Sequence, residues 1–134
     1  MKRTPFLILL PLVVLSGCLL VSPGKGDGVW LAYTPVQCMG NPWEQDWLAM
    51  HEDDWEGYPG QRSGDGLSPG EKEVIVQYYF RQGITVRSIA STEWDGAVCL
   101  ACSCPAGYTL YVLVPEAQAE AMMKLGFQAS GNPN

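Results

Sequence analysis

Three cysteines lie within six residues of this chain, in the stretch Cys99-Leu100-Ala101-Cys102-Ser103-Cys104-Pro105, and a fourth, Cys38, lies far upstream. Four cysteines can pair in three ways, and every pairing joins Cys38 to one member of the cluster. A bond between Cys102 and Cys104 would close a very small, strained ring. We therefore expect Cys38 to pair with Cys102 or Cys104. Such a cross-link limits the chain to folds in which its first part lies beside the cluster.

The N-terminus has the pattern of an export signal. Lys2 and Arg3 precede an apolar run from Pro5 to Val14, which is too short to span a bilayer stably. The next residues, Leu15-Ser16-Gly17-Cys18, resemble the lipobox of bacterial lipoproteins. The resemblance implies a diacylglyceryl group on the sulfur of Cys18, cleavage before Cys18, and acylation of the new amino group by a fatty acid such as palmitate. An ordinary secretory signal and an uncleaved anchor are the alternatives.

Loss of residues 1–17 would remove two basic residues and no acidic one, which lowers the net charge from −6 to −8. An acidic surface repels nucleic acid and anionic lipid headgroups, so we expect neither as a partner. Membrane association would then depend on the lipid at Cys18. Leu19 takes the place of the Asp that commonly retains lipoproteins at the inner membrane, which favours the outer membrane or the cell surface.

Export also bears on the chemistry of the cluster, because thiols outside the cytosol tend to oxidise. Cys99 and Cys102 have the spacing of half a zinc site, but Cys104 and the distant Cys38 do not form a second such pair. Redox-active dithiols use the same spacing at a helix N-terminus, whereas this one lies between two expected strands. We therefore expect disulfides among Cys38, Cys99, Cys102 and Cys104, with no metal and no cofactor.

Two segments carry helix start signals. Asn41-Pro42-Trp43-Glu44 and Ser68-Pro69-Gly70-Glu71 each have a capping residue, a proline at the first helical position and a glutamate that completes a capping box. The second segment continues through residues of high β-propensity, but its start signal and Gly83 at its end favour a helix. Because this helix is apolar over most of its circumference, we expect the sheet on one side and the first helix on the other.

Apolar and β-branched runs predict strands over 29–38, 84–94 and 108–114, and helices are expected over 41–51, 68–82 and 115–125. The third strand is apolar on both faces, which is typical of a central strand. The order β-α-α-β-β-α predicts an α+β fold, with a small antiparallel sheet of about three strands and helices on one face. One domain, 29–127, would follow a lipidated tether, 18–28, and precede a flexible tail, 128–134.

Three tryptophans, Trp43, Trp47 and Trp55, lie close together in the sequence. They could form a platform for sugars or aromatic groups, but core anchors in a small domain are the more economical interpretation. The acidic, glycine-rich segment 52–66 lacks the spacing of an EF-hand loop, so we expect a solvated loop without a tight calcium site. Nothing in the sequence around His51, the only histidine, marks this residue as a catalytic base.

The motifs Thr34-Pro35-Val36-Gln37-Cys38, Asn41-Pro42-Trp43-Glu44 and the 99–105 cluster resemble small, uncharacterised exported proteins of bacteria and archaea. This resemblance implies no activity. We expect a non-enzymatic, lipid-anchored binding or structural module of the cell envelope, with an envelope protein or a small molecule as its partner. The alternative is a thiol-dependent redox or metal-handling protein that uses the Cys99–Cys104 cluster.

Overall fold

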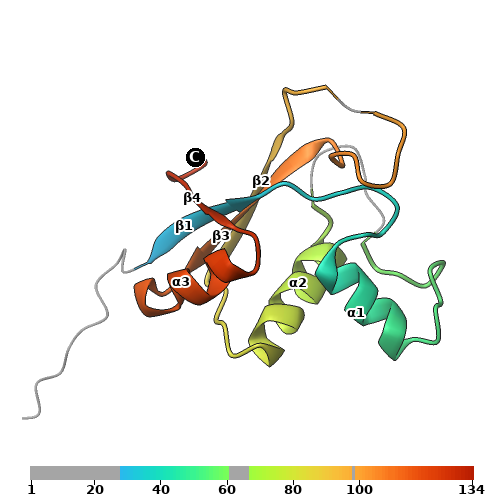
Figure 1. Cartoon of the computed structure of the whole chain (residues 1–134). Helices are drawn as coiled ribbons and strands as arrows, with labels where there is room; N and C mark the ends of the chain where they lie inside the picture. The colour runs from blue at the N-terminus through green and yellow to red at the C-terminus, as the bar shows by residue number, and fades with distance from the viewer. Residues whose placement is uncertain (1–27, 61–66, 98) are drawn as a thin grey trace, which may run out of the picture.

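The structure is a computed structural model, and it describes residues 28–60, 67–97 and 99–134. Its element order is β1 (Val29–Tyr33), α1 (Pro42–Met50), α2 (Pro69–Arg81), β2 (Ser88–Glu93), β3 (Tyr108–Val114), α3 (Glu116–Lys124) and β4 (Gln128–Ala129). The helices lie on one side of the sheet (Figure 1). The predicted α+β fold is confirmed. The predicted leader, Cys18 and nearly all of the predicted tether lie outside the described residues.

The sheet is antiparallel throughout, with the strand order β2-β3-β1-β4. β3 is therefore central, as its apolar sequence predicts. Alternate β3 residues are buried on the helix side, and Leu110 and Val112 are completely inaccessible to solvent. Leu31 of β1 stands opposite Val112, so the two central strands supply the floor of the core.

The helix caps form as the sequence predicts. The backbone N–H of Asn41 donates to Oε2 of Glu44 at 2.9 Å, which closes the first capping box. The Ser68 hydroxyl accepts from the N–H of Glu71 at 3.0 Å. Gly83 follows α2 with φ 78°, a left-handed conformation that glycine adopts without strain. These contacts fix the direction in which both helices leave their loops.

Three differences from the predicted elements have local causes. β1 ends at Tyr33, because Pro35 cannot donate to a ladder, and only the isolated bridge between Val36 and Pro105 continues the pairing. β2 begins at Ser88, because the N–H of Ile84 bonds to the last turn of α2 instead of to a strand. β4 lies where the tail was predicted to begin, so the prediction is wrong for Gln128 and Ala129; two residues are too few to give a strand pattern.

Aromatic side chains join the helices to the sheet. Trp43 of α1 and Tyr79 of α2 have ring centroids 6.4 Å apart, and Tyr79 meets the ring of Phe127, just before β4, at 5.6 Å. Trp43 and Tyr79 are among the largest fully buried side chains. α2 thus has α1 on one side and the sheet layer on another, as predicted. Phe80, on a third side of α2, is 67% exposed.

Candidate functional site

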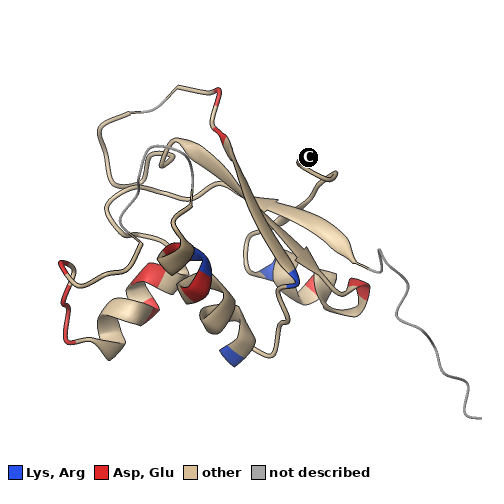
Figure 2. Cartoon of the chain, turned by 180° about the vertical axis from the view of Figure 1, so that it is seen from behind, with Lys and Arg blue, Asp and Glu red and all other residues tan. Residues whose placement is uncertain are grey.

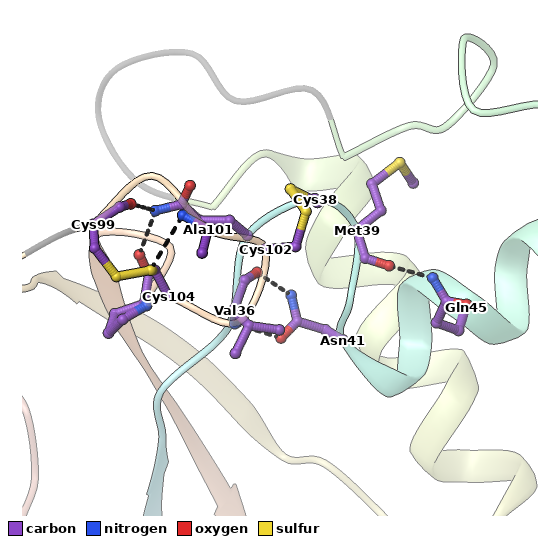
Figure 3. Close-up of a disulfide and its surroundings, with 11 residues drawn as sticks. Val36, Cys38, Met39, Asn41, Gln45, Cys99, Ala101, Cys102 and Cys104 are labelled. Atoms are coloured by element: carbon purple, nitrogen blue, oxygen red, sulfur yellow. Dashed lines mark hydrogen bonds between the residues drawn. A yellow bond between two sulfur atoms is a disulfide. The ribbon is translucent and has the colours of Figure 1, made fainter.

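The cysteine cluster forms two disulfides. Cys38 pairs with Cys102, with Cα atoms 5.1 Å apart, and Cys99 pairs with Cys104, with Cα atoms 5.6 Å apart. Figure 3 shows both bonds beside the turn that follows β1. Of the two partners predicted for Cys38, the structure selects Cys102. The expectation of a disulfide-stapled domain is confirmed.

Hydrogen bonds dock the cluster on the turn that carries Cys38. The Gln37 side-chain amide donates to the carbonyl of Cys99 at 2.9 Å and to that of Pro105 at 3.0 Å. The N–H of Gln37 also donates to the carbonyl of Cys104 at 3.0 Å. Cys38 itself has φ 57°, so the chain turns sharply at this residue. The sequence signals the disulfides, but not this role of Gln37.

The chemistry open to the cluster follows from these pairings. A sulfur in a disulfide is neither a thiolate nucleophile nor a thiolate ligand. Cys104 is buried, whereas Cys38, Cys99 and Cys102 are exposed. Within 28–60, 67–97 and 99–134, no group of three or more His, Cys, Asp or Glu side chains could hold a metal ion.

Two glutamates of the helix caps are buried, a feature that sequence reasoning missed. Glu44 and Glu71 are 7% and 4% exposed. Trp43 Nε1 donates to Oε1 of Glu71 at 2.8 Å, which links the start of α1 to the start of α2. Burial, and to a smaller extent the Glu71 carboxylate, raises the pKa of the Tyr58 phenol above its usual range. The capping-box pattern marks both glutamates in the sequence, but it gives no sign of their burial.

Gly60 packs closely against these groups. A Cβ atom at this position would lie 1.7 Å from Oε2 of Glu71 and 2.1 Å from Cε1 of Tyr58. A side chain at this position would have to displace the Glu71 carboxylate and the Tyr58 ring, so a glycine lets the loop after α1 pack closely against α2. The buried Glu71 carboxylate therefore joins α1, α2 and this loop.

A pocket of about 300 Å³ lies between α1 and α2. Its walls are mainly apolar and include Trp47, Met50, His51, Pro59, Val74 and Gln77. The rings of Trp47 and His51 stack with centroids 3.9 Å apart and an interplanar angle of 10°. His51 Nδ1 lies 2.7 Å from the carbonyl oxygen of Trp47, which fixes the imidazole against the indole.

Charged groups flank the pocket at the C-terminal end of α2. Arg81 lines the pocket and forms an ion pair with Asp46 of α1. Because both side chains are substantially exposed, this pair adds little to stability. It does tie the two helices together at the rim, and it places a cation and a carboxylate beside an apolar hollow.

The three tryptophans occupy three different environments. Trp43 is completely buried, as a core anchor should be. Trp47 is half-buried and forms one wall of the α1–α2 pocket, and Trp55 is 65% exposed in the acidic loop. The core interpretation is therefore confirmed for Trp43 and wrong for Trp55. The spacing of four residues predicts that Trp43 and Trp47 share one helix face, but it does not predict that only Trp43 is fully buried.

Comparison of the chain with protein-family models, with curated proteins and with solved structures finds no match. Among the described residues, no helix is long and apolar enough to cross a membrane.

Proposed function

We propose that this protein is a lipid-anchored, non-enzymatic binding module of the cell envelope, and that the α1–α2 pocket takes an aromatic or apolar group of a small molecule. The observation that carries the proposal is the stacked Trp47–His51 pair in an apolar hollow of about 300 Å³. Ligand sites are typically concave and mostly apolar, with a few fixed polar groups, and this volume lies at the lower end of their range.

The polar groups of the pocket support the choice of ligand. His51 is held by its contact with the Trp47 carbonyl, and Arg81 is held by Asp46. Groups that are already fixed lose little entropy when a ligand binds. The half-buried indole of Trp47 and the imidazole stacked on it give the pocket an aromatic wall, with Met50 as an adaptable neighbour.

Lipid attachment at Cys18 is the second part of the proposal, and its support is the lipobox sequence. One acyl chain holds a protein only marginally at a membrane, whereas two or three chains hold it firmly. Cys18→Ala should abolish the incorporation of labelled palmitate and release the protein from membranes. Continued labelling of the variant would refute this assignment.

An NMR titration tests the pocket. A ¹⁵N-labelled, oxidised form that begins at Gly28 is titrated with indole, N-acetyl-leucine amide and glucose. Indole should shift the amide signals of α1 and α2 saturably, whereas glucose should not. Gln77→Trp should fill the pocket and abolish the shifts, and Gln82→Trp, which places the same side chain outside the lining, should leave them unchanged. Indole shifts scattered over the sheet, or unaffected by Gln77→Trp, would contradict the proposal.

A thiol-dependent redox or metal-handling function is the second candidate. It requires free thiols, and both pairs of sulfurs are within bonding distance in this structure. A free-thiol count on protein purified from the envelope separates the two candidates. The binding module predicts no reactive thiol, whereas the redox or metal function predicts a readily reduced pair or bound metal.

A further inference from the structure

The two edges of the sheet differ sharply. β4 forms one edge with two residues, and proline and glycine follow it closely. β2 forms the other edge with six residues, Ser88–Glu93, without proline and without charge until its last residue. Proteins usually protect an edge by keeping it short, bulged or charged, because free backbone groups recruit further strands. Between its ends, β2 has none of these protections.

The hydrogen-bond pattern shows which groups of β2 face outward. The N–H of Trp94 donates to the carbonyl of Gly107 at 3.1 Å, and Glu93 stands opposite Tyr108. Bonded and non-bonded pairs alternate in an antiparallel ladder. The backbone groups of Ile89, Ser91 and Glu93 therefore point away from β3, and no described strand pairs with them.

A groove of about 390 Å³ lies between β2 and α2 on the helix side of this edge. Val76 lines the groove, and Phe80, one turn further along α2, is 67% exposed. Residues four apart share a face of a helix, so Phe80 continues the surface of Val76 along α2 as an apolar stripe that begins at the groove. The side chains of a further strand beside β2 that face the helices would meet this stripe at the groove.

The charges of the groove differ from those of the rest of the chain. Acidic residues gather on α1 and on the loop that follows it (Figure 2). The groove is lined by Lys72 and Arg87 and by one acidic residue, Glu73. These are two of the four Lys and Arg residues in the described ranges. The groove therefore favours a ligand that carries a carboxylate.

We propose that the β2 edge and the α2 stripe bind an extended peptide segment of another protein, which adds a fifth strand to the sheet. Its backbone pairs with Ile89, Ser91 and Glu93, and its alternate apolar side chains cover Val76 and Phe80. A carboxylate of the segment lies near Lys72 and Arg87. In this binding mode the main chain supplies affinity and the pockets for alternate side chains supply specificity. The site lies on the other side of Glu73, which lines both hollows, and its proposed binding does not depend on the α1–α2 pocket.

Peptide selection with a backbone control tests this inference. Random peptides displayed on phage are selected against the oxidised full-length protein. We expect enriched sequences in which apolar residues alternate and an acidic residue lies near one end. Each enriched peptide is then synthesised in two forms, N-methylated at odd or at even positions. One form should lose binding, and the other should keep it within about twofold, because only alternate residues bond to the edge.

Protein variants locate the peptide on the surface. Phe80→Ser should weaken binding at least about tenfold, and Met123→Ser, an exposed apolar residue of α3, should have no effect. Lys72→Glu should weaken binding about fivefold, more at low salt than at high salt, whereas Lys124→Glu should not. Failure to enrich any peptide, equal loss with both N-methylated forms, or insensitivity to Phe80→Ser would overturn the proposal. A dimer in sedimentation that Phe80→Ser dissociates would overturn it too, and would assign the edge to a second copy of the chain.

Discussion

The cystine end and the helix–sheet core of this domain are held together by different means. In the core, alternate residues of β3 pack against Trp43, Ile75 and Tyr79, all of which are almost completely buried. In the stretch 95–103, every described residue is exposed, and Leu100 is fully exposed. Covalent bonds and the Gln37 hydrogen bonds hold this stretch in place. The contrast shows that a segment with almost no apolar burial can still have a fixed place in a fold.

The largest expected effect comes from removing the long-range disulfide between Cys38 and Cys102. Replacing Cys38 and Cys102 together by Ser should lower the free energy of unfolding by about 4 kcal/mol, because the bond joins residues 64 positions apart and restricts the unfolded chain. Denaturation with guanidinium chloride measures this loss. The single variant Cys38→Ser should also leave Cys102 as an exposed thiol that reacts with maleimide. A free Cys38 thiol in the oxidised wild-type protein would refute the link.

A substitution in the core should lower the free energy of unfolding by a comparable amount, but by leaving a cavity in the folded state. Ile75 of α2 is completely buried, so Ile75→Ala should cost about 3 kcal/mol by leaving a cavity. The half-buried Val76→Ala, on the same helix, should cost about 1 kcal/mol or less. Reducing agent should leave both differences unchanged. Equal losses at the two positions would show that the core does not lie where the structure places it.

Removing the short-range disulfide between Cys99 and Cys104 should lower stability less than removing the long-range one. Cys99 and Cys104 are only five positions apart, so the chain-entropy model gives about 2 kcal/mol for their bond. We expect Cys99→Ser with Cys104→Ser to lower the denaturation midpoint by about half as much as the loss of the Cys38–Cys102 bond. A larger effect than that of the long-range pair would mean that the ring shapes the fold through contacts and not through chain entropy.

Alkaline pH should lower the stability of the core, and this is the smallest of the four expected effects. Burial raises the pKa of Tyr58 and Tyr79 above the ordinary value of 10.0, whereas both phenols ionise normally in the unfolded chain. The contribution of these two phenols to the free energy of unfolding is therefore complete below about pH 10, and it is lost progressively as the pH rises above this value. Tyr58→Phe should reduce this dependence, measured from denaturation midpoints between about pH 9 and pH 11, more than Tyr111→Phe on the opposite face. An equal slope in both variants would contradict the assignment to Tyr58.

Much of the fold could be predicted because its signals are local. Caps, glycine stops and a seven-residue apolar run define α1, α2 and β3 almost to the residue. β4 escaped prediction because two residues carry no periodicity, and their pairing depends on β1, which is distant in the sequence. The start of β2 was misplaced for a related reason, since Ile84 is apolar but bonds to the helix before it.

The candidate sites were harder to predict. Counting cysteines narrowed the partner of Cys38 to Cys102 or Cys104. Four cysteines allow only three pairings, and the pairing that joins Cys102 to Cys104 would close a strained ring. The α1–α2 pocket needs the packing angle of two helices, which no residue pattern encodes. The burial of Glu44 and Glu71 depends in the same way on groups brought together from separate segments, such as Trp43 and Gly60.

The order of the cysteines along the chain has a consequence for biosynthesis. A chain that crosses a membrane from its N-terminus exposes Cys38 to an oxidising compartment before its partner arrives. Cys102 follows 64 positions later, after both α1 and α2 have passed. Cys99 and Cys104 emerge almost together and can close their ring at once. If the chain is exported as proposed, Cys38 would remain a free thiol for longer than Cys99 or Cys104, and a mixed disulfide formed in that interval would have to be exchanged for the bond to Cys102.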